Sequence, residues 1–452
     1  MQDNDYLKLI ELSKRYTTEY IENVNCMPVF PRQESIDNLR AFDEPFPQAS
    51  YDPLEVIHFL QANGSCGTVA NSGGRYFGFV NGGILPIAHA ANWLADTWNQ
   101  NSALYLMSPL SSKLEEVCEN WLVELLGLAQ GTAAGFVSGS SNATLCALAA
   151  ARNYIIGNQG YDIYQNGLRN APPVRIVIGE QAHSSVIKAL SILGFGKKEI
   201  EIVPADSYGR IQPQYLPKLD DKTILIIQAG NVNGGAFDPI NELCGLAQNS
   251  GAWVHVDGAF GLWAAASKNH RHLVYGLEKA DSYSVDAHKT LNASYDCGIV
   301  LCKRREALIN AMQATGAYLN YSDKRDGMLY TTEMSRRSRC ISLWATLKQL
   351  GAAGVERLVD TLCAGAEYFA DELKKRGFTI IQPVFFNQFM LKCETPVQTQ
   401  RLIEQIQSSG TCWCGGSVWK GEPVIRISIC SHKTTKADID ESIFAFVDAN
   451  IL

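Results

Sequence analysis

The stretch Trp253-Val254-His255-Val256-Asp257-Gly258-Ala259 is a short apolar run that ends in an acidic residue. Similar short runs recur through the middle of the chain, and segments with helical spacing of apolar residues lie between them. Near-continuous apolar strands that alternate with helices are typical of a mainly parallel sheet covered on both faces. The sequence therefore predicts an α/β fold, with strands at residues 175–179, 201–203, 224–228, 253–257 and 298–302 and helices at 141–154, 184–193 and 241–250.

Both ends of the chain differ from this middle part. Residues 4–25 have nearly helical spacing of apolar side chains, and the proline-rich segment 28–53 predicts an irregular arm. The C-terminal pattern predicts helices at 355–375, 396–408 and 436–447 and strands at 379–381, 389–392 and 424–429. We therefore expect three parts: an N-terminal helical dimerisation arm (1–75), a large domain (76–345) and a small C-terminal α+β domain (346–452).

The overall composition argues against several classes of protein. The chain has 452 residues and a net charge of −7, which disfavours non-specific binding to nucleic acids or anionic membranes. No run approaches the roughly 18–20 apolar residues that cross a bilayer, and the polar N-terminus does not resemble a secretory signal. The 13 cysteines show no repeating framework and no zinc-type spacing. We expect reduced thiols, no metal site, and a cytoplasmic protein.

Two charged residues lie where predicted strands end. Lys289 belongs to Ser284-Val285-Asp286-Ala287-His288-Lys289-Thr290, and a lysine held there can form an imine with an aldehyde cofactor. Asp257 ends a buried strand and needs a compensating cation, which a protonated pyridine nitrogen would supply. Taken singly, the two segments leave open a solvated Lys289 and a helix-capping Asp257.

Two further segments extend this pattern. The stretch 137–144 (VSGSSNAT) precedes a run of good helix formers, and its N–H groups and hydroxyls suit a phosphate or a simple helix cap. His183 follows the strand at 175–179, where its ring can stack on a flat cofactor or cap the next helix. Ligands of such sheets bind at the carboxyl ends of the strands. The four segments together therefore predict one site for pyridoxal 5′-phosphate (PLP).

The chain resembles the group II PLP-dependent amino-acid decarboxylases, which include the aromatic-amino-acid, histidine and glutamate decarboxylases. The resemblance covers nearly the whole chain and rests on four motifs: DAHKT (286–290), YDCG (295–298), QAHSS (181–185) and HVDGA (255–259). It implies fold type I, with a swapped N-terminal arm, a large seven-stranded PLP domain and a small C-terminal domain. It also implies a homodimer with the active site at the interface.

The resemblance assigns a role to each candidate site residue. Lys289 would bind PLP as an imine, and Asp257 would pair with the pyridine nitrogen. His183 would stack on the ring and help to orient the substrate carboxylate, while Ala259 would pack on the opposite ring face. The phosphate would be bound by Ser140 and Ser141, with help from Asp286 or His288. The candidate substrate contacts are Phe79, Asn81 and Arg426, of which Arg426 is equally well explained as a structural ion pair.

The sequence departs from the family pattern at two places. Asn142 stands where family decarboxylases usually have an acidic residue. The loop whose tyrosine donates a proton after CO2 leaves corresponds to residues 318–339, which is shorter than in the aromatic enzymes. Tyr318, Tyr321 and Tyr330 are candidates, and Tyr330 is preferred because it closely precedes the arginine cluster at 336–339, which matches the family. In this family, loss of the loop tyrosine is associated with aldehyde-forming oxidative deamination.

The predicted function is therefore decarboxylation of an L-amino acid to an amine and CO2. The alternatives are other PLP reactions on the same fold, namely aldehyde synthesis, transamination and carbon–carbon lyase chemistry. A catalytically silent dimeric homologue is a further alternative, against which the presence of Lys289, Asp257 and His183 argues. The sequence does not identify the amino-acid substrate.

Overall fold

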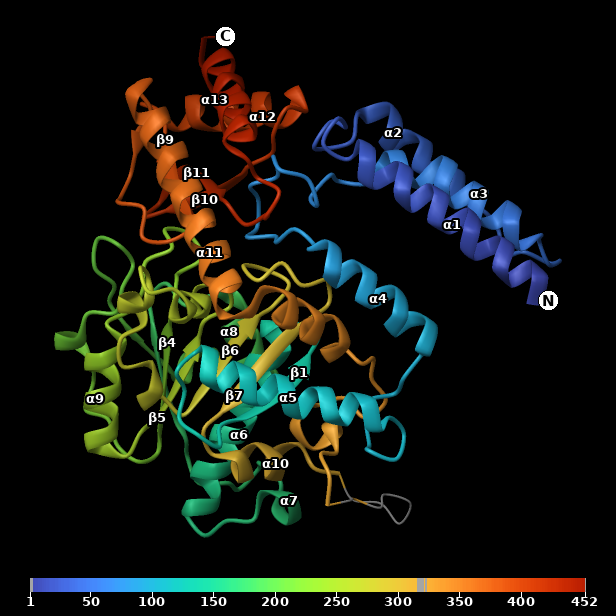
Figure 1. Ribbon diagram of the computed structural model, residues 1–452. Helices are drawn as coiled ribbons and strands as arrows, with labels where there is room; N and C mark the ends of the chain where they lie inside the picture. Colours follow the sequence, from blue (N-terminus) through green and yellow to red (C-terminus); the bar gives the residue numbers. More distant parts are fainter. Residues whose placement is uncertain (1–2, 315–320, 322, 452) are drawn as a thin grey trace. The chain divides into compact units, whose positions relative to one another are not determined.

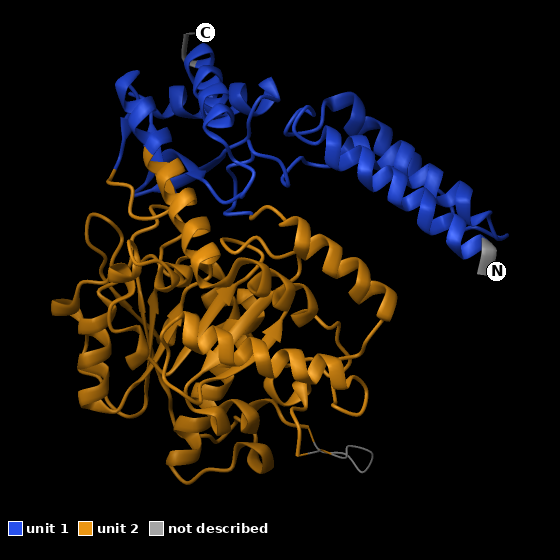
Figure 2. Ribbon diagram, in the orientation of Figure 1, with its two compact units in different colours: residues 1–81, 368–381, 390–452 blue, residues 82–367, 382–389 orange. Residues whose placement is uncertain are grey.

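The computed structural model describes residues 3–314, 321 and 323–451 of the chain (Figure 1). It divides into two compact units, shown in different colours in Figure 2. The first unit comprises Met1–Asn81, Tyr368–Ile381 and Met390–Leu452, and the second comprises Gly82–Glu367 and Gln382–Phe389. The three-part division at residues 75 and 345 stays a prediction. Among the described residues, no helix has both the length and the apolar character needed to cross a membrane.

A seven-stranded sheet forms the centre of the second unit, in the order β1-β7-β6-β5-β4-β2-β3. Five strands, from β6 through β5, β4 and β2 to β3, run parallel to one another. Strand β7 is antiparallel to both of its neighbours, β1 and β6. The predicted α/β fold with a mainly parallel sheet is confirmed. The strands are β1 (Ala133–Val137), β2 (Arg175–Gly179), β3 (Ile200–Val203), β4 (Thr223–Gln228), β5 (Trp253–Asp257), β6 (Ser282–Asp286) and β7 (Gly298–Cys302).

Helices cover this sheet, and every residue of β1, β4, β5, β6 and β7 is buried. Such complete burial is expected when both faces of a sheet are covered. Helix α6 packs across β1, β5, β6 and β7, and its small residues Ala143, Ala147 and Ala151 lie in the shared apolar core. The helices are α4 (Pro86–Trp98), α5 (Pro109–Leu125), α6 (Ser140–Asn158), α7 (Ile163–Asn166), α8 (Ser184–Ile192), α9 (Ile240–Ser250), α10 (Arg305–Met312) and the first part of α11 (Cys340–Lys375), which is broken at Gly351.

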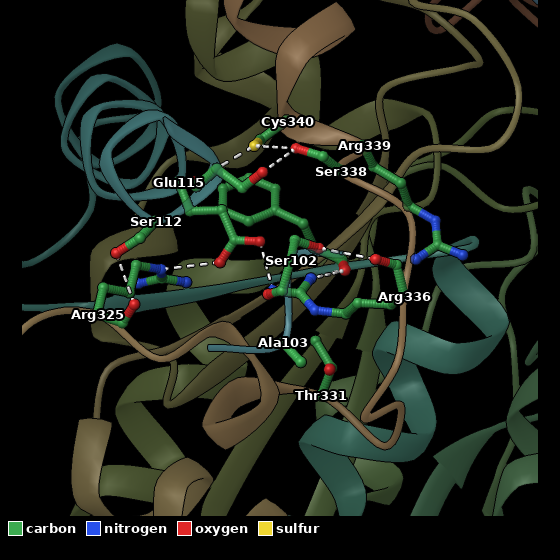
Figure 3. A network of polar contacts seen from close by, with 12 residues as sticks. Ser102, Ala103, Ser112, Glu115, Arg325, Thr331, Arg336, Ser338, Arg339 and Cys340 are labelled. Carbon is green, nitrogen blue, oxygen red and sulfur yellow. Dashed lines mark hydrogen bonds and ion pairs between the residues drawn. The ribbon is translucent and has the colours of Figure 1, made fainter. Parts of the chain in front are cut away.

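Charged side chains, not another strand, satisfy the outer edge of β1, and Figure 3 shows Arg325 and Arg336 beside Glu115. The backbone N–H of Ala134 donates to Glu119 at 2.7 Å, and the carbonyl oxygen of Ala134 accepts from Arg325. The carbonyl oxygen of Phe136 accepts from Arg336 at 2.9 Å. Buried backbone groups on an edge strand need partners of this kind. These side chains therefore allow β1 to be an edge strand and still be fully buried.

The same side chains form a buried network of ion pairs. Glu115 pairs with Arg336 and, at 3.0 Å, with Nε of Arg325. Glu119 pairs with Arg305 and, at 2.7 Å, with Nη1 of Arg325. Because a buried charge is costly unless it is paired, each member of this network depends on the others. The network joins α5, β1, α10 and the segments on both sides of the short helix η8 (Gly327–Tyr330).

The first unit contains a four-stranded sheet and a pair of N-terminal helices. The sheet order is β10-β11-β9-β8, and helix α12 packs on β11 and on α13. Helix α1 packs along α3, where the rings of Tyr16 and His58 meet edge to face. The elements are α1 (Asp3–Asn23), α2 (Gln33–Asn38), η1 (Leu39–Phe42), α3 (Pro53–Gly64), β8 (Thr379–Ile380), β9 (Gln388–Lys392), α12 (Pro396–Ser409), β10 (Gly415–Trp419), β11 (Glu422–Ser428) and α13 (Lys436–Ile451).

The sequence prediction was wrong for the segment 28–53, which is not wholly irregular. Helix α2 begins after Arg32, whose backbone is extended, and η1 continues it to Phe42. The prolines at both ends of this segment leave a proline-free stretch long enough for these short helices. Strands β1 and β10 were also missed, because glycine and alanine have a low preference for strands.

We expect Glu115→Ala to lower the free energy of unfolding by about 3–5 kcal/mol, because it leaves Arg325 and Arg336 buried beside too little negative charge. Chemical denaturation of the full chain measures the change. Glu116→Ala is the matched control, since its exposed ion pair with Lys113 contributes at most about 1 kcal/mol. Equal losses in the two variants would contradict this account of the network.

Candidate active site

The carboxyl ends of four strands meet at one edge of the second unit's sheet. Strands β2, β5 and β6 point the same way because the pairs that connect them are parallel. Strand β1 shares their direction, since β1 and β6 are both antiparallel to β7. The residues singled out in the sequence lie at these ends: Ser140 opens α6 after β1, His183 follows β2, Asp257 ends β5 and Asp286 ends β6.

Asp286 connects several of these residues. Its side chain is 2% exposed, and it accepts hydrogen bonds from the backbone N–H of Ser140 at 2.6 Å and from the Ser140 hydroxyl at 2.7 Å. Nζ of Lys289 lies 3.1 Å from Oδ2 of Asp286, and Nε2 of His288 lies 3.6 Å from Oδ1. Four of the predicted site residues are therefore in direct contact through one carboxylate.

Asp257 lies deep at the same edge. Burial raises the pKa of its carboxyl, and the nearby positive charges of His183 and Lys289 act in the opposite direction. The backbone N–H of Ala259 donates to Oδ1 of Asp257 at 3.3 Å. Among the described residues, no cationic side chain is within ion-pair distance of Asp257. A carboxylate in this position would be stabilised by a cationic ring nitrogen.

His183 and Ala259 lie beside this carboxylate. His183 precedes α8, and its Nδ1 accepts from the backbone N–H of Ser185 at 3.2 Å and lies 2.7 Å from the Ser185 hydroxyl oxygen. The helix-capping role that the sequence left open is therefore present, and it fixes the orientation of the ring. Ala259 joins two strand ends, because its carbonyl oxygen also accepts from the backbone N–H of Asp286 at 2.9 Å.

His288 is held on two sides. Its ring stacks on the ring of Tyr295 with 4.2 Å between centroids, and its Nδ1 accepts from the backbone N–H of Cys297 at 3.1 Å. Burial lowers the pKa of His288, while the Asp286 carboxylate favours the charged form. Nε2 of His288 thus faces Asp286 and the start of α6.

Two glycines allow the backbone to approach closely here. A Cβ atom on Gly298 would overlap the backbone of Gly139, so the turn before α6 lies directly against the start of β7. A Cβ atom on Gly82 would overlap the carbonyl oxygens of His288 and Lys289. Any larger residue at either position would displace the segments that carry Ser140 or Lys289.

The three candidate tyrosines have different surroundings. Tyr330 is 7% exposed, its hydroxyl oxygen accepts from Arg305 at 3.0 Å, and the Arg325 guanidinium lies 4.0 Å from its ring centroid. Tyr321 is 40% exposed, and its hydroxyl donates to the carbonyl oxygen of Ala314 at 2.6 Å. Tyr318 lies outside the described residues. The preference for Tyr330 stays a prediction; its hydroxyl oxygen accepts from Arg305, a member of the buried ion-pair network.

The candidate substrate residues Phe79, Asn81 and Arg426 belong to the first unit. Phe79 is 60% exposed, has a φ of 53°, and stacks on Trp413 with 5.4 Å between ring centroids. Burial lowers the pKa of Arg426, and Tyr76 acts in the opposite direction. Burial also raises the pKa of Tyr76 to about 12.

Two residues that were not predicted from the sequence, Trp413 and Thr332, support these sites. Trp413 stacks on Tyr76 with 5.0 Å between centroids, as well as on Phe79. Thr332 donates its hydroxyl hydrogen to the side-chain oxygen of Asn142 at 3.0 Å, which fixes the segment after η8 to the first turn of α6. Neither contact has a local sequence signal, because each joins residues far apart in the chain.

The donor set at this sheet edge fits PLP. Asp257 suits the pyridine nitrogen, Lys289 offers an amine, and the start of α6 offers Ser140 and Ser141 to a phosphate. One feature opposes the fit: Asp286 places a negative charge beside Ser140.

Comparison with known proteins agrees with this assignment. The family described as "Pyridoxal-dependent decarboxylase conserved domain" matches residues 40–388. The chain belongs to this family, and its cofactor is PLP. Cysteine sulfinic acid decarboxylase from Mus musculus is 31% identical over 355 residues, which cover 73% of this chain and 71% of that protein. Aromatic-L-amino-acid decarboxylase from Bacillus atrophaeus is 27% identical over 445 residues, which cover 93% of this chain and 90% of that protein.

Solved structures share the fold. The crystal structure of Oryza sativa TDC with PLP and tryptamine has a TM-score of 0.92 at 20% identity, covering 100% of this chain and 98% of that one. The crystal structure of mouse CSAD has a TM-score of 0.87 at 23% identity, covering 98% of this chain and 99% of that one. The predictions of family, fold and cofactor are confirmed.

Proposed function

We propose that this chain decarboxylates an L-amino acid to give an amine and CO2. The observation that carries the proposal is the placement of Lys289 and Asp257 at one sheet edge in a member of the pyridoxal-dependent decarboxylase family. Two similar proteins act, by their names, on cysteine sulfinic acid and on aromatic L-amino acids. Acidic and aromatic amino acids are therefore the first substrates to test.

Bound PLP would supply a ring that accepts the electron pair left when CO2 departs. In this proposal, Lys289 holds the cofactor and Asp257 keeps a proton on the ring nitrogen. His183 stacks on one ring face and helps to orient the substrate carboxylate, and Ala259 covers the other face. The side chains of Ser140, Ser141 and His288 bind the phosphate, and Asp286 contacts Ser140 and Lys289 beside it.

This proposal assigns the substrate contacts to Arg426, Phe79 and Asn81. Arg426 offers a guanidinium to a carboxylate, and Phe79 and Asn81 contact the side chain of the amino acid. Phe79 already stacks on Trp413 and is largely exposed, which suits a residue that covers a flat or apolar group. The segment at 79–81 also has an unusual backbone, since both Phe79 and Val80 have positive φ.

We also propose a cytoplasmic homodimer with its active site at the interface. Large apolar side chains are exposed along the N-terminal helices and the segments beside them, which is typical of a surface that a partner covers. The most exposed include Leu7, Phe46, Tyr51, Val56 and Leu60. All 13 cysteines are free thiols, as expected in a reducing compartment.

We expect the purified chain with PLP to release CO2 and the matching amine from at least one acidic or aromatic L-amino acid. Lys289→Ala should lose the visible absorbance of lysine-bound PLP and lower turnover by a factor on the order of 10³ or more, because it removes the covalent attachment. Lys268→Ala, whose side chain is 79% exposed, is the matched control and should behave like the wild type. Unchanged absorbance in Lys289→Ala would refute the cofactor assignment.

The product of the reaction depends on the proton donor. The crystal structure of Rhodiola rosea 4-hydroxyphenylacetaldehyde synthase shares this fold with a TM-score of 0.86 at 20% identity, so the fold alone does not decide between amine and aldehyde. We propose Tyr321 as the proton donor, because Tyr321 is exposed whereas Tyr330 is buried beside the ion-pair network.

In air-saturated buffer, we expect Tyr321→Phe to shift the products from amine towards aldehyde, ammonia and hydrogen peroxide, because the phenol that delivers the proton is gone and dissolved O2 takes up the two electrons instead. Quantifying amine, aldehyde and peroxide from one substrate measures the shift. Tyr330→Phe is the matched control: it should leave the product ratio unchanged and lower stability by about 1–2 kcal/mol through the lost bond to Arg305. The opposite pattern, with Tyr330→Phe alone changing the ratio, would assign the proton to Tyr330.

A further inference from the structure

The start of α6 presents two hydrogen-bond donors to a single acceptor. The backbone N–H and the hydroxyl of Ser140 each donate to a different oxygen of the Asp286 carboxylate, at 2.6 and 2.7 Å. These are the donors that a helix start offers to a phosphate. The carboxylate of Asp286 therefore accepts the donors that an anion at this helix start would need.

Positive groups complete the surroundings of this carboxylate. Nζ of Lys289 lies 3.1 Å from Oδ2, and the imidazole Nε2 of His288 lies 3.6 Å from Oδ1. The backbone carbonyl of Asp286 accepts from the indole N–H of Trp263 at 2.9 Å, which fixes the end of β6. With its backbone fixed, Asp286 remains beside the helix start when its side chain turns.

A carboxylate and a phosphate have the same hydrogen-bonding character. An ionised aspartate only accepts hydrogen bonds, and so does a phosphate dianion. Both therefore need the Ser140 donors, and a phosphate beside the buried Asp286 carboxylate would be repelled by it. An asparagine in the same place would still accept from the Ser140 N–H and would offer an N–H2 donor to the phosphate.

We propose that Asp286 competes with the cofactor's 5′-phosphate for the two donors of Ser140, so that PLP binding requires Asp286 to release them. This inference rests on the proposed function, since it concerns the same PLP site. It makes Asp286 a positioning residue that contacts Ser140 and Lys289 and weakens the affinity for the phosphate. The consequence is that bound PLP exchanges with free PLP more readily than it would if the phosphate alone accepted from the donors at the start of α6.

The test compares two ligands that lack an aldehyde and so cannot react with Lys289. Pyridoxamine 5′-phosphate carries the phosphate and pyridoxamine does not. We expect Asp286→Asn in the full chain, freed of cofactor by dialysis, to bind pyridoxamine 5′-phosphate about tenfold or more tightly than the wild type, which is the scale for removing a like charge at close range. The affinity for pyridoxamine should stay within about twofold of the wild type, because that ligand has no phosphate.

Asp281→Asn is the matched control. Asp281 is a buried carboxylate just before the other end of β6, where it accepts from the backbone N–H of Val254 at 2.9 Å. This variant removes the same charge from the same strand and should not change the affinity for either ligand. Asp286→Ser, which is also neutral, provides a second variant should Asp286→Asn fail to fold, and it should show the same selective tightening.

Two results would overturn the inference. Equal or weaker binding of pyridoxamine 5′-phosphate by the Asp286 variants would mean that Asp286 supports the phosphate site and does not compete for it. Equal tightening for both ligands would mean that the effect does not involve the phosphate. Failure of the proposed function is distinguishable, because a wild type that binds neither ligand and shows no visible absorbance with PLP would refute the site itself.

Discussion

The carboxylate of Asp286 connects the parts of the candidate site. It ends β6, accepts both donors of Ser140 at the start of α6, and contacts Lys289 and His288 three and two residues further along the chain. One buried side chain thus connects the end of β6, the start of α6 and the reactive Lys289. Because a buried carboxylate is stable only with such partners, the local geometry of the site and the stability of this sheet edge depend on the same contacts.

The buried ion pairs at the outer edge of β1 have a related role. Ser140 opens α6 and is separated from the end of β1 by two residues, so the position of β1 decides where the helix start lies. Glu119, Arg325 and Arg336 provide the hydrogen bonds that a further strand would have made, and Glu115 balances the arginines. The contact between Thr332 and Asn142 fixes the following segment to α6. The phosphate side of the site is therefore supported from the edge of the sheet.

Much of this arrangement could be predicted from the sequence, because short apolar strands and the residues that follow them are local signals. Asp257, His183 and Lys289 were found in that way, and parallel strands bring their ends together without further information. The pairing of Ser140 with Asp286 joins residues 146 positions apart, so no local pattern could show it. The same holds for the burial of Tyr330, whose hydroxyl oxygen accepts from Arg305 and whose ring lies against the Arg325 guanidinium.

The central claim is that Lys289 holds PLP at this sheet edge, and reduction of the holoenzyme with borohydride tests it most directly. Reduction fixes the cofactor to whichever lysine carries it, and peptide mass spectrometry then locates the added mass. The account predicts a single modified peptide, with the mass of the reduced cofactor on Lys289. The same mass on a different lysine, with Lys289 unmodified, would contradict it.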